Sequence, residues 1–102
     1  MNCKVEEKDG IYLISLDGEM DTAAAIEVEK ALKSVLKTEE KKDVVIDCEC
    51  LEYIASSGLR ILLAMQKSAM AGGYRLTLRN LNDEIMDVFK LTGFIDIFEI
   101  EE

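Results

Sequence analysis

Hydrophobic residues recur along this chain at two different spacings. The strand-like segments, which are short apolar runs or alternate apolar with polar residues, are residues 11–16, 44–48 and 74–79. The helix-like segments, in which apolar residues recur every three or four positions, are residues 22–36, about 57–70, and 82–92. The order of these segments predicts an alternation of strands and helices after a first pair of strands.

Glycine and aspartate mark the turns between these segments. The Asp-Gly pair at residues 9–10 separates a first strand, Cys3–Glu7, from the strand at residues 11–16. This dipeptide is typical of a tight hairpin turn. Gly18 is expected to break the second strand, and Asp21 or Thr22 is expected to cap the first helix.

This order of elements predicts the fold class. Each strand–helix–strand unit should cross over right-handedly and make its strands parallel neighbours, whereas the hairpin adds an antiparallel pair. We therefore predict one α/β domain spanning residues 1–102, with a mixed, mostly parallel sheet of four to five strands, an N-terminal hairpin and three or four packed helices. Residues 94–100 are expected to add a short strand or to lie across the core.

The same pattern predicts which side chains are buried. The run at residues 44–48 is expected to form a strand covered on both faces. The charged segment at residues 37–43 is expected to be a solvated turn. Tyr53 is expected to pack, and Met65 and Met70 are expected in the core or at its rim. The first helix is expected to bury an apolar stripe that contains Ile26, Ala31, Leu32, Val35 and Leu36.

Composition narrows the class of partner. The chain has 102 residues, of which 49% are hydrophobic, which suits one domain with its own core. Twelve basic residues against 21 acidic ones give a net charge of −9, which disfavours nucleic acid and anionic membranes. No apolar signal region or membrane-length run is present. We therefore expect a cytoplasmic protein without direct membrane insertion, whose partners are proteins.

Residue types also limit the chemistry. The sequence contains no histidine, so a Ser-His-Asp or Cys-His catalytic arrangement is excluded. It also lacks the glycine-rich phosphate-binding loops. Cys48 and Cys50 are expected on one side of a strand, yet a structural zinc site usually needs four ligands, so small buried thiols are favoured over a metal site. We expect no cofactor, no metal and no enzymatic activity.

Two hydroxyls mark the junction between the strand at residues 44–48 and the following helix. Ser56 and Ser57 lie where the first backbone N–H groups of the helix lack internal partners. A serine oxygen there can cap the helix. A phosphate on such a serine would be favoured by the same N–H groups and by the helix dipole. The residues thus leave two interpretations open: a plain helix cap, or a phosphorylation switch.

The segment Asp47-Cys48-Glu49-Cys50-Leu51-Glu52-Tyr53-Ile54-Ala55-Ser56-Ser57-Gly58-Leu59 resembles the signature of STAS domains. Two shorter stretches resemble this family as well. They are Gly18-Glu19-Met20-Asp21 and Leu91-Thr92-Gly93-Phe94. Single-domain bacterial members of the family include the anti-sigma-factor antagonists, so the resemblance implies both a fold and a function.

The resemblance implies a binding module switched by phosphorylation. Its partners would be an anti-sigma factor that is also a serine kinase and a PP2C-type phosphatase. The phosphorylated residue would be Ser56, with Ser57 as the alternative. Asp21 matches an aspartate near the phosphorylation site, and Gly58 would let a partner backbone approach. Arg60 departs from the family, which often has a small residue there, and it could pair with a phosphate from the first helical turn.

One departure from the family pattern supports an alternative function. Ala55 stands where the family usually has an aspartate just before the phosphoserine. The alternative is a constitutive STAS accessory subunit of a transport or other multiprotein complex, without a phosphorylation cycle. A small enzyme or ligand carrier is a third hypothesis, which the absence of histidine disfavours.

Overall fold

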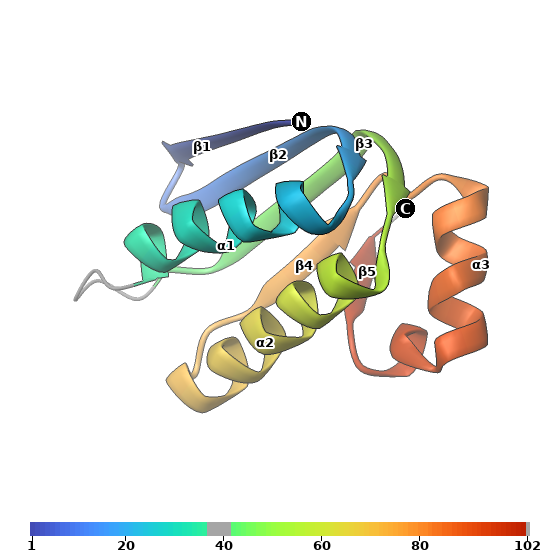
Figure 1. Cartoon of the computed structure of the whole chain (residues 1–102). Coiled ribbons are helices and arrows are strands. Elements are labelled where there is room, and N and C mark those ends of the chain that lie inside the picture. Colours follow the sequence, from blue (N-terminus) through green and yellow to red (C-terminus); the bar gives the residue numbers. More distant parts are fainter. Residues whose placement is uncertain (37–41, 102) are drawn as a thin grey trace.

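The computed structural model describes residues 1–36 and 42–101, and Figure 1 shows how their helices and strands are arranged. Most of the predicted charged turn, residues 37–41, lies outside the described residues. The elements in chain order are β1 (Asn2–Lys8), β2 (Ile11–Met20), α1 (Thr22–Leu36), β3 (Val44–Ile54), α2 (Ser56–Gly72), β4 (Leu76–Arg79), α3 (Asp83–Thr92), the 3₁₀ turn η1 (Phe94–Asp96) and β5 (Glu99–Glu101).

The strands form a mixed sheet in the order β1-β2-β3-β4-β5. β1 and β2 are antiparallel, and every other neighbouring pair is parallel. The turn between β1 and β2 has left-handed backbone angles at both central residues, φ 52° at Asp9 and 80° at Gly10. Such angles match the right-handed twist of a hairpin. The predicted fold class, including the hairpin, is confirmed.

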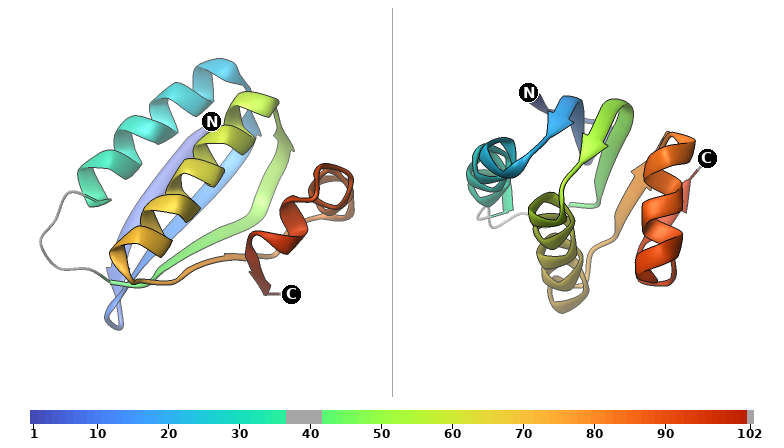
Figure 2. Two further views of the ribbon diagram at one scale, coloured as in Figure 1. Left: turned by 90° about the horizontal axis from the view of Figure 1, so that it is seen from below. Right: turned by 45° about the vertical axis from the view of Figure 1, so that its right-hand side comes forward.

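One hydrophobic core joins the sheet to all three helices. Figure 2 shows α1 and α2 side by side across one face of the sheet, with α3 at the side where β5 ends it. The core includes side chains from the central strands and from each helix, among them Ile14, Ile46, Leu78, Val28, Leu62 and Phe89. Val45 and Asp47, which alternate with buried neighbours in β3, are only half-buried. The prediction of a strand covered on both faces is therefore wrong.

The pairing between β2 and β3 contains two irregularities. Ser15 lies opposite Asp47, but Asp17 lies opposite Cys50, so β3 gains one residue there. Gly18 lies opposite Leu51, but the next residue, Glu19, lies opposite Tyr53, so β3 gains a second residue there. β2 continues through Gly18, whose φ of 108° few other residues adopt. The prediction that Gly18 breaks the strand is wrong, because this glycine accommodates a bulge inside it.

These extra residues change which side chains of β3 face the core. Cys48 is buried and Cys50 is exposed, so the prediction that they share one side of the strand is wrong. Tyr53 is 52% exposed, so the prediction that it packs is also wrong. An extra residue reverses the alternation of a strand, and the sequence of β3 by itself gives no sign of where that happens.

The helices begin and end largely where local chemistry predicts. Asn82 Oδ1 accepts from the Ile85 N–H at 2.8 Å and caps α3, and Asp21 Oδ1 accepts from the Ala24 N–H at 2.8 Å and caps α1. Ile26 is 54% exposed, which contradicts its predicted place in the buried stripe of α1. Among the side chains of α1 described up to Lys33, the buried ones are Ala24, Ala25, Val28 and Leu32. The prediction is confirmed for Leu32 and wrong for Ile26, and the side chains of Val35 and Leu36 lie outside the described ones.

The C-terminal segment forms the short strand that was one of its two predicted conformations. After Gly93 ends α3 with φ 78°, η1 leads into β5, which pairs parallel to β4. The rings of Phe89, Phe94 and Phe98 pack together with centroid separations of 5.5 to 6.4 Å. This aromatic contact joins α3 to the end of the sheet.

Asp47 stabilises the irregular part of β3. Its carboxylate accepts from Asn80 Nδ2 at 3.1 Å, from the Glu49 N–H at 3.0 Å, and from Arg79 Nη2 at 3.4 Å. Partial burial raises the pKa of Asp47, but the three donors and the Arg79 charge outweigh it, so the pKa is lowered overall. The folded state therefore favours the ionised carboxylate.

Asp47→Asn should lower the free energy of unfolding by about 1–2 kcal/mol near neutral pH, because charge-assisted hydrogen bonds are lost. A lowered folded pKa gives stability that is present above the unfolded pKa, about 3.9, and is lost as pH falls through the folded pKa. The difference in the free energy of unfolding between Asp47→Asn and the native protein, measured with urea, should therefore be smaller at about pH 3 than at pH 7. Asp87→Asn, at an exposed position of α3, is the control, and a difference that stays constant with pH would contradict the assignment.

Candidate functional site

The amino ends of α1 and α2 meet at one edge of the sheet. β2 and β3 are parallel and end side by side, with Met20 opposite Ile54. The Ala55 N–H donates to the Met20 carbonyl at 2.9 Å, and Ser57 Oγ donates to Thr22 Oγ1 at 3.3 Å. The start of α1 and the serine pair, predicted as parts of one site, are therefore brought together, as the upper ends of these helices in Figure 1 show.

Both serines lie inside the first turn of α2 and not at its cap. The residue before the helix is Ala55, whose φ of −81° and ψ of 166° are those of an N-cap but whose side chain makes no capping hydrogen bond. The prediction that a serine caps this helix is therefore wrong. Ser56 is exposed and Ser57 is half-buried.

The first turn of α2 has no side chain that neutralises its N–H groups. It contains no acidic residue, whereas α3 has Asn82 as its cap and two acidic residues in its first turn. Unpaired N–H groups and the helix dipole make this end of a helix partly positive. A negative group attached to Ser56 would therefore lie next to favourable partners.

Gly58 packs closely against the ends of β2 and β3. It is buried, and a Cβ atom at this position would lie 2.9 Å from Ile54 Cγ1 and 3.1 Å from both Cγ and Sδ of Met20. The distance of 2.9 Å is shorter than real Cβ atoms show, and the two of 3.1 Å are tight contacts. The glycine lets α2 approach the ends of β2 and β3, so the structure places it against the core.

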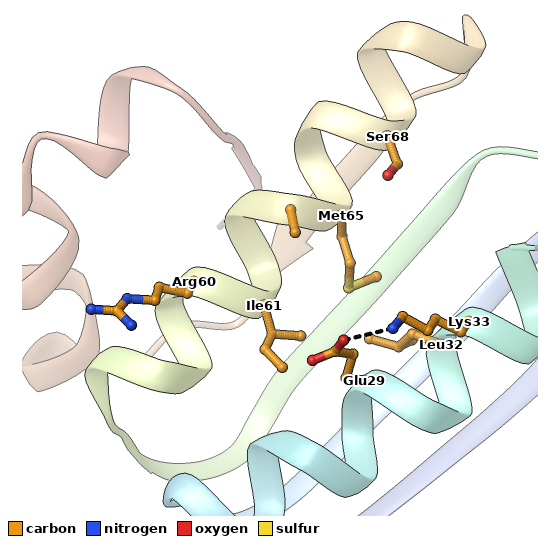
Figure 3. A pocket seen from close by; sticks show the side chains of 8 residues that line it. Glu29, Leu32, Lys33, Arg60, Ile61, Met65 and Ser68 are labelled. Carbon is orange, nitrogen blue, oxygen red and sulfur yellow. Dashed lines mark ion pairs between the residues drawn. The ribbon is translucent and has the colours of Figure 1, made fainter.

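A groove lies between α1 and α2, further along both helices than the serine pair. Its cavity has a volume of about 220 Å³ and its walls are mostly apolar. Figure 3 shows the Glu29–Lys33 ion pair, at 2.8 Å, beside Met65, and Arg60 pointing away from these residues. The lining residues are Glu29, Leu32 and Lys33 from α1 and Arg60, Ile61, Ala64, Met65 and Ser68 from α2. Met65 is buried and Met70 is 70% exposed, so the former lies in the core.

The thiols do not form a metal site within the described residues. No group of three Cys, Asp or Glu side chains there is arranged to hold a metal ion. Burial, and then the Asp47 charge, raise the pKa of Cys48 to about 12, so this thiol stays protonated. Among residues 1–36 and 42–101, no helix is both long and apolar enough to span a bilayer.

Comparison with known proteins decides the family. The STAS domain model matches residues 2–102. The chain belongs to the STAS domain family. The predicted family and fold class are thus confirmed over nearly the whole chain.

Two relatives of this STAS domain carry related names. BtrV of Bordetella bronchiseptica, provisionally named an anti-sigma factor antagonist, is 31% identical over 98% of this chain and 85% of its own length. An anti-sigma-B factor antagonist of Listeria monocytogenes is 30% identical over 99% of this chain and 89% of its own length. Both similarities span the strands and helices that form the site.

Solved structures show the same fold. An anti-sigma factor antagonist from Mycobacterium paratuberculosis superimposes with a TM-score of 0.80 at 29% identity, covering 97% of this chain and 83% of its own. The antagonist SpoIIAA in its unphosphorylated form gives a TM-score of 0.79 at 19% identity, covering 99% and 88%. The fold is thus one on which antagonists of this kind are built.

The uncapped start of α2 gives a stability prediction. Ala55→Asp should raise the free energy of unfolding by about 1 kcal/mol, because the carboxylate can accept from the first-turn N–H groups at an already extended backbone position. Thermal unfolding of the two proteins measures the change. Asn82→Ala should have the opposite and larger effect, because it removes both the cap of α3 and the hydrogen bond from Asn82 Nδ2 to the Leu51 carbonyl. If Ala55→Asp is instead less stable than the native protein, the first-turn N–H groups of α2 are not available to a carboxylate at the N-cap.

The buried position of Gly58 gives a second prediction. Gly58→Ala should lower the free energy of unfolding by about 1–3 kcal/mol, because the added methyl group overpacks against Met20 and Ile54. Gly72→Ala, at the last residue of the same helix, should be neutral or stabilising, since alanine favours the helix. Urea unfolding measures the free energy of unfolding of both variants. Equal changes in the two variants would argue against the close contact of Gly58 with Met20 and Ile54.

Proposed function

We propose that this protein is an anti-sigma factor antagonist that is switched by reversible phosphorylation of Ser56. The observation that carries this proposal is the exposed hydroxyl of Ser56 in a helix turn without a cap. A hydroxyl in this position is accessible to a kinase. The phosphate that forms there meets unpaired N–H groups, so the domain can carry it without unfolding.

Phosphorylation would act mainly on the contact with a partner. Transfer from ATP forms a bond between Ser56 Oγ and phosphorus, breaks the bond from the γ-phosphorus to the bridging oxygen of ADP, and releases the hydroxyl proton to a base of the kinase. The phosphate adds about −1.5 to −2 charges to a protein of net charge −9. At an interface, desolvation and repulsion of that charge would cost several kcal/mol. About 3 kcal/mol already weakens binding more than a hundredfold.

The names of the relatives support an anti-sigma factor as the partner, and we propose two specific partners in line with the family resemblance. One is an anti-sigma factor that is also a serine kinase, and the other is a PP2C-type phosphatase that removes the phosphate. Asp21, Ser56 and Ser57 would contact them at the shared end of α1 and α2, and Arg60 would lie at its border. The protein itself would act in the cytoplasm by binding, without catalysis.

The constitutive accessory subunit remains the second candidate, because Ala55 replaces the usual aspartate before the serine. A sulfate transporter family protein from Wolinella succinogenes has the same fold, with a TM-score of 0.74 at 23% identity, over 87% of this chain and 71% of its own. Such a subunit would bind its partner equally well whether or not Ser56 carries a phosphate.

The kinase reaction tests the switch directly. The protein is incubated with ATP, Mg²⁺ and the anti-sigma factor kinases of its own genome, one at a time, and the phosphate is located by mass spectrometry. We expect one phosphate on Ser56 and none in Ser56→Ala, while Ser68→Ala, at an exposed serine of α2, behaves as the native chain does. A phosphate that persists in full in Ser56→Ala would reject the site.

The same samples distinguish a switch from unfolding. Phosphorylation should weaken binding to the kinase at least about a hundredfold, while the melting temperature stays equal or rises by a few degrees. Titration calorimetry and thermal unfolding measure the two effects. Unchanged binding by the phosphorylated protein would favour the accessory subunit over the antagonist.

A further inference from the structure

The two adjacent serines of α2 have different surroundings. Ser57 is half-buried, and its Oγ donates to Thr22 Oγ1 at 3.3 Å across 35 positions of sequence. Ser56 is exposed. The hydroxyl of Ser57 is therefore engaged with α1, and the hydroxyl of Ser56 faces solvent.

The backbone fixes the position of Thr22. Asp21 caps α1 through the Ala24 N–H at 2.8 Å, and its carbonyl accepts from the Ala25 N–H at 2.9 Å. On the other side of Thr22, the Met20 carbonyl accepts from the Ala55 N–H at 2.9 Å. The main chain of Thr22 thus lies between two hydrogen-bonded neighbours, and its Oγ1 lies 3.3 Å from Ser57 Oγ.

We infer that Thr22 is a specificity-determining residue, which directs phosphorylation to Ser56 by holding the hydroxyl of Ser57. This inference rests on the proposed function. Phosphoryl transfer to Ser57 forms the Oγ–phosphorus bond, breaks the bond to ADP and moves the hydroxyl proton to a base of the kinase. That proton is already donated to Thr22, so the contact must break before Ser57 can react.

Charge acts in the same direction. A phosphate on Ser57 would place about −1.5 to −2 charges beside Thr22, in the first turn of α1, whose N-cap is the acidic residue Asp21. That carboxylate already accepts from the first-turn N–H of Ala24. The capped start of α1 therefore offers a phosphate on Ser57 less stabilisation than an uncapped helix start would.

Thr22→Val tests the inference, because valine keeps the shape of threonine and removes the hydroxyl. Phosphorylation by the kinase that modifies the native chain is followed by fragmentation mass spectrometry, which separates the two serine sites. We expect the ratio of Ser57 to Ser56 phosphate to rise about three- to tenfold, the factor by which loss of an ordinary hydrogen bond changes an equilibrium. In a Ser56→Ala background, Thr22→Val should raise the initial rate on Ser57 by a similar factor.

Two further variants separate this effect from general damage to the fold. Thr22→Ser restores the hydroxyl and should restore the native ratio. Thr77→Val removes a threonine hydroxyl in β4, away from the site, and should leave the ratio unchanged. A merely structural role of Thr22 would lower the rates at both serines together and leave their ratio unchanged.

The outcomes distinguish this inference from the function on which it rests. Phosphate on Ser56 of the native chain, with the same site ratio in a folded Thr22→Val protein, would overturn the role of Thr22 alone. A native chain that none of the kinases modifies would overturn the proposed function, and this inference with it.

Discussion

The position of Ser56 depends on the two extra residues that β3 contains relative to its neighbour β2. From Ser15 opposite Asp47, an undistorted ladder would place Met20, five residues on, opposite Glu52. The two extra residues in β3 place Met20 opposite Ile54 instead. Ala55 can then donate its N–H to the Met20 carbonyl, and α2 begins directly beside α1. The bulges therefore determine that the serines lie next to the first turn of α1.

Packing then fixes which way the serines face. The inner side of the first turns of α2 is buried by Gly58, Leu59 and Leu62, and the space between α2 and the strand ends is too small for a Cβ on Gly58. Because this side is committed to the core, Ser56 points outward, and Ser57 reaches Thr22 at the boundary between the helices. A covalent change at Ser56 can thus alter the surface while the core remains unchanged.

Electrostatics makes this surface suited to a switch. The start of α2 is unneutralised, so it favours a local negative charge, while the protein as a whole carries a net charge of −9. Within the domain, a phosphate would be stabilised by the start of α2. At an interface, the same phosphate would repel an acidic partner and resist desolvation.

Local chemistry accounts for what could be predicted. The hairpin turn at residues 9–10, the caps Asp21 and Asn82 and the stop at Gly93 each depend on the preferred backbone angles or hydrogen bonds of a few neighbouring residues. The family resemblance, which extends over nearly the whole chain, supplied the function. The exposure of Tyr53 and Cys50 and the continuation of β2 through Gly18 were missed. Each depends on the register between two strands that are distant in sequence, which β3 alone does not encode.

The sequence by itself thus determined the order of the elements, most of their ends and the family, because spacing, caps and turns act over a few residues. Only the tertiary structure decided that Ala55 stands at the cap position, that Gly58 faces the core, and that Ser57 is tied to Thr22 while Ser56 is free to face solvent. These outcomes depend on the distance between α2 and the ends of β2 and β3, and that distance is set only when the strands pair and the core packs.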